Sequence, residues 1–179
     1  ETYEFHRIYH QVYDFVTVDL SSFYFDVLKD RLYTAAPNSH TRRSSQTVLY
    51  LILEALTRAL APIYSFTCEE IWEHLSSKAE REASVHMASF MPANSLIEGL
   101  PSQSLKRLEN WHLLIQIRSN VLKVLEEARQ AKYIGNSLEA KVTVAGENSS
   151  APVLKSYESM LPALLIVSQV ELGTPSKET

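Results

Sequence analysis

The chain has 179 residues, 45% of them hydrophobic, and a formal net charge of −4. This length and hydrophobic content allow one sizeable domain, or a domain with a small appendage, and argue against global disorder. The acidic balance confines any nucleic-acid site to a local patch of cations. The single cysteine, Cys68, excludes an internal disulfide and a cysteine-based zinc site and fits a reducing compartment. No apolar run is long enough for a membrane span, and the start "ETYEFHRIYH" predicts a piece excised from a longer protein.

The first hundred residues are predicted to be helical, because the first of only four glycines is Gly99. Residues 3–33 contain no proline or glycine, and their apolar side chains recur at helical spacing, which predicts one long helix or two collinear helices. Pro37 and the turn formers of residues 36–41 end this segment.

A second helix is predicted from Arg42 onwards by an apolar stripe at Leu49, Ile52, Leu53, Leu56 and Leu60. Thr67 lies three residues before Glu70, which is the pattern of a capping box and predicts that a third helix begins at Thr67. Residues 76–104 contain two prolines and many small polar residues, so they are expected to form an irregular linker or excursion.

The sequence after residue 104 predicts one more long helix, followed by a change from the helical period to the alternating pattern of a strand. Apolar residues at helical spacing indicate a helix over 105–132. Alternation over 137–146 predicts a half-buried strand with Leu138, Ala140, Val142 and Val144 on one side. Residues 151–161 suggest a short helix, 163–172 a second strand, and 174–179 a disordered tail. The expected fold is therefore mainly α: a helical bundle over 1–134 with a small α/β appendage over 135–173.

The segment "SFYFDVLKDRLYT", residues 22–34, mixes aromatic and charged side chains. On a helical wheel its apolar residues form one arc, and Arg31 falls in the middle of that arc. A buried guanidinium must be paired, so Arg31 is predicted to be a structural charge. Lys29 lies on the opposite side, where it can meet a ligand.

Local cations are the only candidate binding groups. Arg42 and Arg43 oppose the dipole at the start of their helix and, with Lys29, are predicted to share one end of the bundle as a phosphate-binding patch. Arg129 and Lys132 are weaker candidates, and solvated surface remains the default interpretation. Arg118 lies close to the apolar face of its helix and is predicted to be a second structural charge.

No catalytic or metal site is predicted. His6 and His10 have the spacing of metal ligands on a helix, but a catalytic zinc site needs a third protein ligand, so two exposed histidines are favoured. There is no glycine-rich phosphate loop, no nucleophile elbow and no cysteine–histidine pair.

Three segments resemble the C-terminal region of bacterial-type isoleucyl-tRNA synthetases: "SFYFDVLKDRLYT", "RRSSQTVLYLILEALTRALAPIYSFTCEEIW" and "WHLLIQIRSNVLKVLEEARQAKYIGNSLEAKVTV". The resemblance implies a helical anticodon-binding domain that grips the anticodon stem and loop of isoleucine tRNA, as a monomer in the cytoplasm. It places aminoacylation, with ATP and magnesium, in a catalytic domain earlier in the parent chain. The HIGH and KMSKS signatures are absent, so this piece is expected to be non-catalytic. A four-cysteine zinc module that often ends the bacterial parent is also absent from this sequence.

Other functions stay open at this point. Valyl- and leucyl-tRNA synthetases share the helical plan but match "KDRLY" and "IGNSLEA" less well. A helical module that binds a partner protein, and a metal-dependent hydrolase built on His6 and His10, are the alternatives outside RNA binding.

Overall fold

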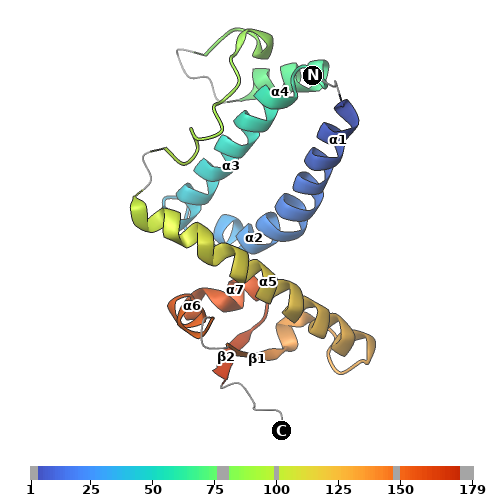
Figure 1. The fold of residues 1–179 in the computed structure, drawn as a ribbon, viewed down its shortest axis with the longest axis vertical. Helices are drawn as coiled ribbons and strands as arrows, with labels where there is room; N and C mark the ends of the chain where they lie inside the picture. Colours follow the sequence, from blue (N-terminus) through green and yellow to red (C-terminus); the bar gives the residue numbers. More distant parts are fainter. Residues whose placement is uncertain (1–3, 76–80, 99–100, 147–149, 174–179) are drawn as a thin grey trace. The chain divides into compact units, whose positions relative to one another are not determined.

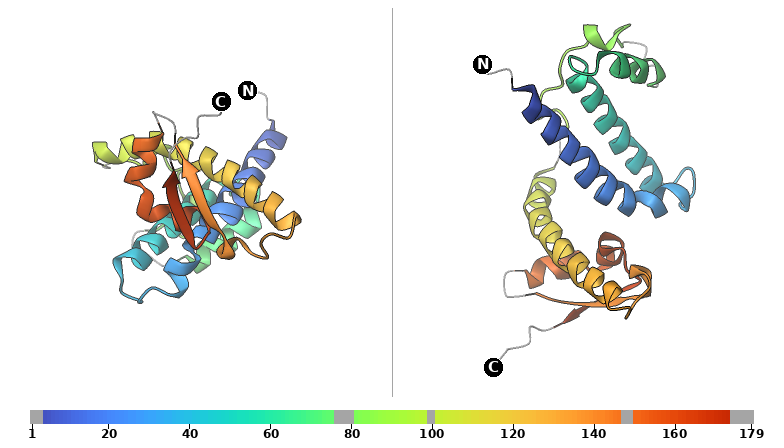
Figure 2. Two further views of the ribbon diagram at one scale, coloured as in Figure 1. Left: turned by 90° about the horizontal axis from the view of Figure 1, so that it is seen from below. Right: turned by 90° about the vertical axis from the view of Figure 1, so that its right-hand side faces the viewer.

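The computed structural model describes residues 4–75, 81–98, 101–146 and 150–173. The chain divides into two compact units, Glu1–Gly99 and Leu100–Thr179, which are described separately below (Figures 1 and 2). The expected class is confirmed, since the chain is mainly helical with a small sheet near its end. The predicted boundary at residue 134 differs from this division and stays a prediction. The predicted tail, and residues 76–80 and 99–100 of the predicted linker, lie outside the described residues.

The first unit begins with one continuous helical run. It comprises α1 (Phe5–Asp14), a π-helical segment (Phe15–Tyr24) and α2 (Phe25–Tyr33). The hydroxyls of Ser21 and Ser22 donate to the carbonyls of Val16 and Thr17, five residues back, as the wider turn of a π-helix permits. The predicted long helix is therefore confirmed, but its π-helical middle was not foreseen.

A short turn returns the chain along this run as α3 (His40–Leu60), and Figure 1 shows the two as the arms of a hairpin. The side-chain oxygen of Ser39 accepts a hydrogen bond from the backbone N–H of Arg42 at 3.3 Å and so caps α3. The arc predicted from the wheel agrees with the burial of this segment, because Leu28 is buried and the other apolar residues of the arc are half-buried: Phe23, Tyr24, Val27 and Leu32.

The far end of α3 packs against α4 (Ser65–His74) and a 3₁₀ turn (Val85–Met87). The core here consists of Ala61, Cys68, Trp72, Leu75 and Val85. The ring of Trp72 is flanked by the guanidinium groups of Arg58 and Arg81, 5.0 and 4.5 Å from its centroid. Its indole N–H donates to the carbonyl of Glu82 at 2.9 Å.

The predicted capping box at Thr67 is wrong. The helix begins two residues earlier, at Ser65, and no side chain caps it. The backbone N–H of Cys68 instead donates to the carbonyl of Tyr64 at 2.9 Å, so Thr67 already lies inside the first turn.

The second unit is built on α5 (Ser102–Gln130), followed by a 3₁₀ turn (Ser137–Glu139) and β1 (Lys141–Ala145). A crossover made of α6 (Ala151–Ser156), a 3₁₀ turn (Glu158–Met160) and α7 (Leu161–Leu165) leads to β2 (Gln169–Gly173). The two strands are parallel, with Lys141 opposite Gln169 and Ala145 opposite Gly173. A parallel pair requires such a crossover, which the figures show beside the sheet.

Two details of the appendage were predicted wrongly. Leu164 and Leu165, expected in the second strand, belong to α7 and are buried. Leu138, expected on the inner side of the first strand, lies in the preceding 3₁₀ turn and is 54% exposed. Gly146 follows β1 directly, and only glycine fits there, because a Cβ at this position would lie 2.8 Å from Leu154 Cδ1 and 3.0 Å from the Ala151 backbone.

Candidate nucleic-acid interface

Lys29 lies on the exposed surface of α2 and is held by a neighbouring acid. Its Nζ is 2.5 Å from Asp26 Oδ1, one helical turn earlier, and its side chain is 66% exposed. The hydrogen bond to Asp26, and then the charge of this carboxylate, raise the pKa of Lys29. Tyr33, four residues further along, is 83% exposed. Lys29 can reach a phosphate only in competition with Asp26.

Arg42 and Arg43 are neighbours in sequence but have different environments. Arg42 is half-buried, and its Nη1 donates to the carbonyl of Ala35 at 3.4 Å, which ties α3 to the turn after α2. Arg43 is exposed and lines an open pocket of about 390 Å³ together with Asn38, His40, Ser44 and Thr47. Neither Lys29 nor Arg42 lines this pocket. A common phosphate patch formed by all three cations stays a prediction, and Lys29 and Arg43 are its exposed members.

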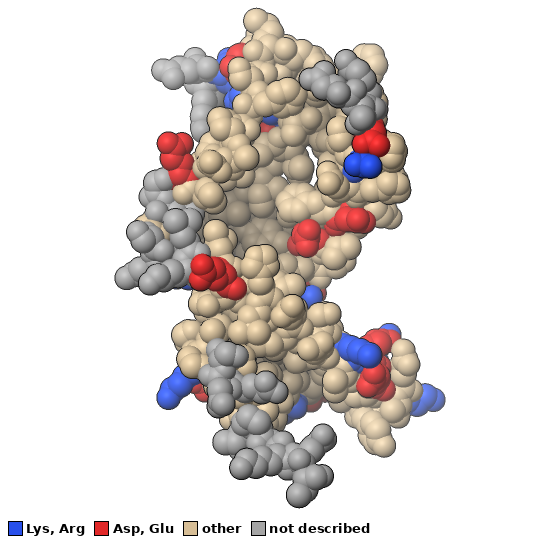
Figure 3. All heavy atoms as spheres, in the orientation of Figure 1, with Lys and Arg blue, Asp and Glu red and all other residues tan. Residues whose placement is uncertain are grey.

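Arg129 lies in the last turn of α5 and forms a two-pronged pair with Glu126. Its Nε and Nη2 each donate to a carboxylate oxygen of Glu126 at 2.8 Å. These hydrogen bonds, followed by one from Gln130, lower the pKa of Glu126, and the same pair raises the pKa of Arg129. In Figure 3, basic and acidic side chains lie next to each other at the end of α5.

Lys132 follows directly in the turn that ends α5, with a left-handed backbone (φ 60°) and an exposed side chain. An open pocket of about 370 Å³ lies beside this turn, between α5 and the chain that leaves it. Its lining consists of Leu122, Leu125, Glu126, Arg129, Ile134, Gly135, Asn136 and Ser137.

The chain beyond the pocket is fixed by hydrogen bonds to its backbone. Asn136 accepts one from the N–H of Leu138 at 3.1 Å, and Glu139 accepts one from the N–H of Gly135 at 2.9 Å. The structure therefore brings Arg129 together with the "IGNS" segment, a neighbourhood that the sequence analysis missed.

The two predicted structural charges differ from each other. Arg118 is half-buried, and its Nε donates to the carbonyl of Leu164 at 3.0 Å. Arg31 is also half-buried instead of fully buried, and within the described residues its guanidinium makes no hydrogen bond or ion pair. Its charge acts on Tyr24, whose pKa is raised by burial and lowered by Arg31. A structural role for either arginine stays a prediction.

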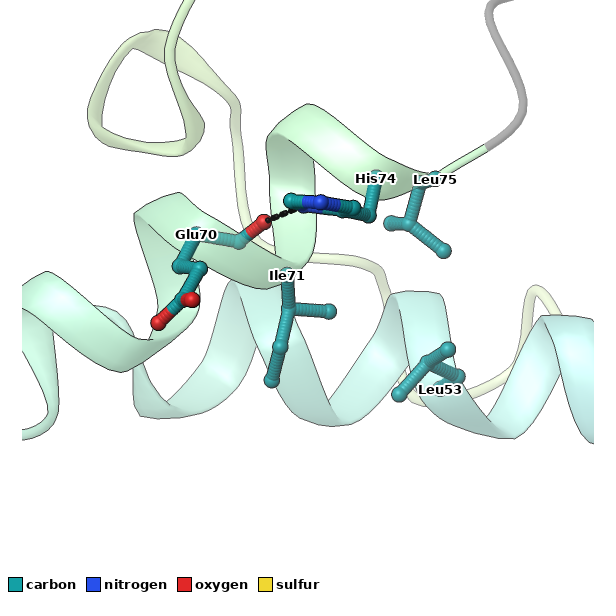
Figure 4. Close-up of a pocket in the computed structure, with 5 residues that line it drawn as sticks. All are labelled: Leu53, Glu70, Ile71, His74 and Leu75. Atoms are coloured by element: carbon teal, nitrogen blue, oxygen red, sulfur yellow. Dashed lines mark hydrogen bonds between the residues drawn. The ribbon is translucent and has the colours of Figure 1, made fainter.

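Another open pocket, of about 410 Å³, lies between α3 and α4 and is lined by Leu53, Glu70, Ile71, His74 and Leu75 (Figure 4). The Nδ1 of His74 donates to the backbone carbonyl of Glu70 at 2.8 Å, which keeps this ring against its own helix. Glu70 and His74 are the polar residues of the lining, and the side chains of Leu53, Ile71 and Leu75 make the rest of it apolar.

His6 and His10 lie one turn apart on α1. Both side chains are exposed, and the ring of His10 meets that of Tyr9 edge-on at 5.3 Å. Among the residues that the structure describes, no group of three or more His, Cys, Asp or Glu side chains could hold a metal ion. In the same residues, no helix combines the length and apolar character of a membrane span.

Comparison with known proteins identifies related sequences. The sequence model of a family described as "Anticodon-binding domain of tRNA ligase" matches residues 1–144. The chain is 46% identical over 173 residues to an isoleucine–tRNA ligase of Syntrophotalea carbinolica, covering 96% of the chain and 18% of that relative. It is 42% identical over 181 residues to the isoleucine–tRNA ligase of Thermotoga neapolitana, covering 99% of the chain and 19% of the relative. The chain thus spans about a fifth of the length of these relatives.

Proposed function

Because the chain belongs to the family of anticodon-binding domains of tRNA ligases, we propose that it binds the anticodon stem and loop of isoleucine tRNA as part of a longer isoleucine–tRNA ligase. The observation that carries this proposal is the match to the family over residues 1–144, together with relatives that are isoleucine–tRNA ligases along nearly the whole chain. The same relatives disfavour valine or leucine as the amino acid of the parent enzyme.

In this proposal, different groups of the protein bind the phosphates and the bases of the RNA. Exposed cations, Arg43 on α3 and Lys132 after α5, would contact backbone phosphates, which position the RNA without reading its sequence. Lys29 would join them only when the RNA competes with Asp26, whereas Arg129 would use its Nη1, which its two hydrogen bonds to Glu126 do not engage. Unstacked loop bases would be recognised by stacking and by hydrogen bonds to their edges.

Catalysis is assigned to the rest of the longer protein. Aminoacylation would use ATP and magnesium in a catalytic domain outside this chain, in the cytoplasm, and any zinc would belong to a separate module. The exposed apolar side chains of α1, a helix without a buried residue, are suited to contact another part of that protein. They include Phe5, Ile8, Tyr9 and Tyr13.

The proposal is tested by titrating the 179-residue chain with isoleucine tRNA and with the same tRNA carrying a swapped anticodon. We expect tighter binding of the isoleucine tRNA, and no isoleucine-dependent exchange of pyrophosphate into ATP. Equal affinity for both tRNAs would show that the chain does not recognise the anticodon. Absence of binding to either would remove the RNA role and favour the α1 surface as the main functional feature.

A further inference from the structure

The turn that ends α5 is an unusual example of a common motif. The N–H of Tyr133 donates to the carbonyl of Ala128 at 2.9 Å, and the N–H of Lys132 donates to that of Arg129 at 3.0 Å. These two bonds define a Schellman motif, in which the left-handed position usually belongs to glycine. Here Lys132 occupies it, with a φ of 60°. A side chain at this position is unfavourable in a left-handed backbone, and such strain is concentrated at functional sites.

The residue after Lys132 also departs from the motif. In a Schellman motif this residue frequently packs an apolar side chain back onto the helix. Tyr133 does not, since its side chain is 86% exposed. Two hydrogen bonds fix the backbone of the turn, so the exposed ring extends from a defined position of the backbone.

Two cations lie beside this ring in the chain. Lys132 is its direct neighbour, and Arg129 is one turn earlier, where Glu126 orients the guanidinium through two hydrogen bonds of 2.8 Å. Downstream, the bonds at Gly135 and Leu138 fix the backbone that leaves the turn. An exposed aromatic face with flanking cations on a fixed backbone is the arrangement that single-stranded nucleic acids bind, with bases on the ring and phosphates on the cations.

We propose that Tyr133 is a stacking platform for one unpaired base of the bound tRNA, and that Lys132 and Arg129 hold the phosphates next to that base. The inference rests on the proposed RNA-binding function and adds a specific residue to it. A protein partner fits this place less well, because one exposed ring with two cations near it in the chain is far smaller than the area that a stable protein interface buries.

The test compares three variants of the 179-residue chain in binding to the isoleucine anticodon stem-loop. Tyr133→Leu keeps an apolar side chain but removes the ring, and should weaken binding about 5- to 150-fold, the range for one stacked base. Tyr133→Phe keeps the ring and should bind within about twofold of the unmodified chain. Phe66→Leu is the matched control: Phe66 is 93% exposed, has no Lys or Arg within four residues in sequence, and its loss should leave binding unchanged.

A second readout separates stacking from charge. Tyr133→Leu should leave the salt dependence of binding unchanged, because no ion pair is lost. Asparagine adopts the left-handed backbone more readily than most residues, so Lys132→Asn should keep the turn. This variant should make the slope of log affinity against log salt concentration shallower by about 0.7, the value for one phosphate contact on a single strand. In a set of stem-loops, 2-aminopurine replaces one loop base at a time. At one position the unmodified chain should quench the 2-aminopurine fluorescence, and Tyr133→Leu should not quench it.

The outcomes are distinguishable. If the unmodified chain does not bind the stem-loop, the proposed function fails and this inference falls with it. If it binds and folded Tyr133→Leu binds equally well, only the stacking platform is overturned. If Tyr133→Phe loses as much affinity as Tyr133→Leu, the hydroxyl and not the ring makes the contact, which also overturns the platform. Near-ultraviolet circular dichroism of each variant monitors the fold.

Discussion

The Nε of Arg118 donates a hydrogen bond to the backbone carbonyl of Leu164 at 3.0 Å, and this bond ties α5 to α7 within the second unit. Leu164 is buried, and its carbonyl is among the last four of α7, which have no partner inside the helix. The arginine thus supplies a donor to a helix end that water cannot reach freely.

Replacing this arginine should destabilise the second unit. Arg118→Leu keeps much of the apolar contact but leaves the Leu164 carbonyl without its donor, which should lower the free energy of unfolding by about 1–3 kcal/mol. Hydrogen exchange should accelerate in α7 and β2 while that in α3 stays unchanged. Lys123→Ala, an exposed cation on the same helix, is the control and should cost less than about 0.5 kcal/mol. Equal effects of the two variants would show that the Arg118 bond has no structural role.

Arg31 should influence the titration of Tyr24 more than the stability of the fold. Its positive charge lowers a pKa that burial has raised, so Arg31→Gln should raise the pKa of Tyr24 further. Nuclear magnetic resonance of ring-labelled tyrosine would follow the titration. Because Arg31 is half-buried, the loss of unfolding free energy should stay below about 1 kcal/mol, whereas breaking a buried ion pair costs about 3–5 kcal/mol. A loss in that higher range would restore the buried pair expected from the sequence.

Cys68 should make the first unit sensitive to alkali. Burial beside Trp72 raises the pKa of the thiol above its usual value of 9.0, so the folded state favours the neutral form. Stability from this group is fully present below pH 9.0 and is lost as the pH rises through the higher pKa of the folded state. Urea titrations at pH 8 and pH 10 give the free energy of unfolding of each protein. The decrease in this free energy from pH 8 to pH 10 should be greater for the natural chain than for Cys68→Ala. The same loss in both would exclude the thiol as the cause.

Substitution of Arg43 should affect tRNA binding, and substitution of Arg42 should affect mainly the stability of the fold. Arg43→Ala removes an exposed cation and should make the salt slope of tRNA binding shallower by about 0.7 without changing the melting temperature. Arg42→Ala removes the bond to the Ala35 carbonyl and should mainly lower stability, by about 1 kcal/mol. Arg7→Ala, an exposed arginine on α1 paired with Glu4, provides a control for nonspecific charge loss. A slope that Arg43→Ala leaves unchanged would remove this residue from the interface.

Lys132→Gly should stabilise the protein and weaken RNA binding at the same time. Glycine adopts the left-handed backbone without steric cost, so the free energy of unfolding should rise by about 1 kcal/mol. The same substitution at Lys123, inside α5, should lower it by about 1 kcal/mol. Chemical denaturation would measure the change in the free energy of unfolding for both variants, which should be opposite in sign. Destabilisation by Lys132→Gly would mean that the lysine side chain itself supports the turn.

Regular apolar stripes made the helices of both units predictable, since Leu49 to Leu60 and the run over 105–132 follow the period of a helix. The start of α4 was missed because Thr67 and Glu70 match a capping pattern that the chain does not use. Leu164 and Leu165 were placed in a strand because a short apolar run fits either structure, and Pro162 near the start of α7 together with burial favours the helix.

The sequence was sufficient to predict which cations could bind RNA, but not which side chains and hydrogen bonds surround each cation. The sequence identifies Lys29 and Arg129 as cations, and the acids that hold them lie three residues earlier, a helical spacing that allows such pairs without showing that they form. The role of Tyr133 depends on a left-handed lysine, and lysine has no general preference for that backbone. No local pattern predicts a residue whose conformation is unfavourable by itself.

The π-helical segment Phe15–Tyr24 makes one stretch of the first unit unusually tolerant of changes in chain length. A π-turn contains one residue more than an α-turn between bonded groups, so deleting a single residue here would let the neighbouring carbonyls and N–H groups re-form the ordinary ladder. The same deletion inside α3 has no spare residue to absorb it and would rotate every later side chain around the helix axis. Length variation among related chains should therefore be concentrated in this segment when it occurs within the helical run.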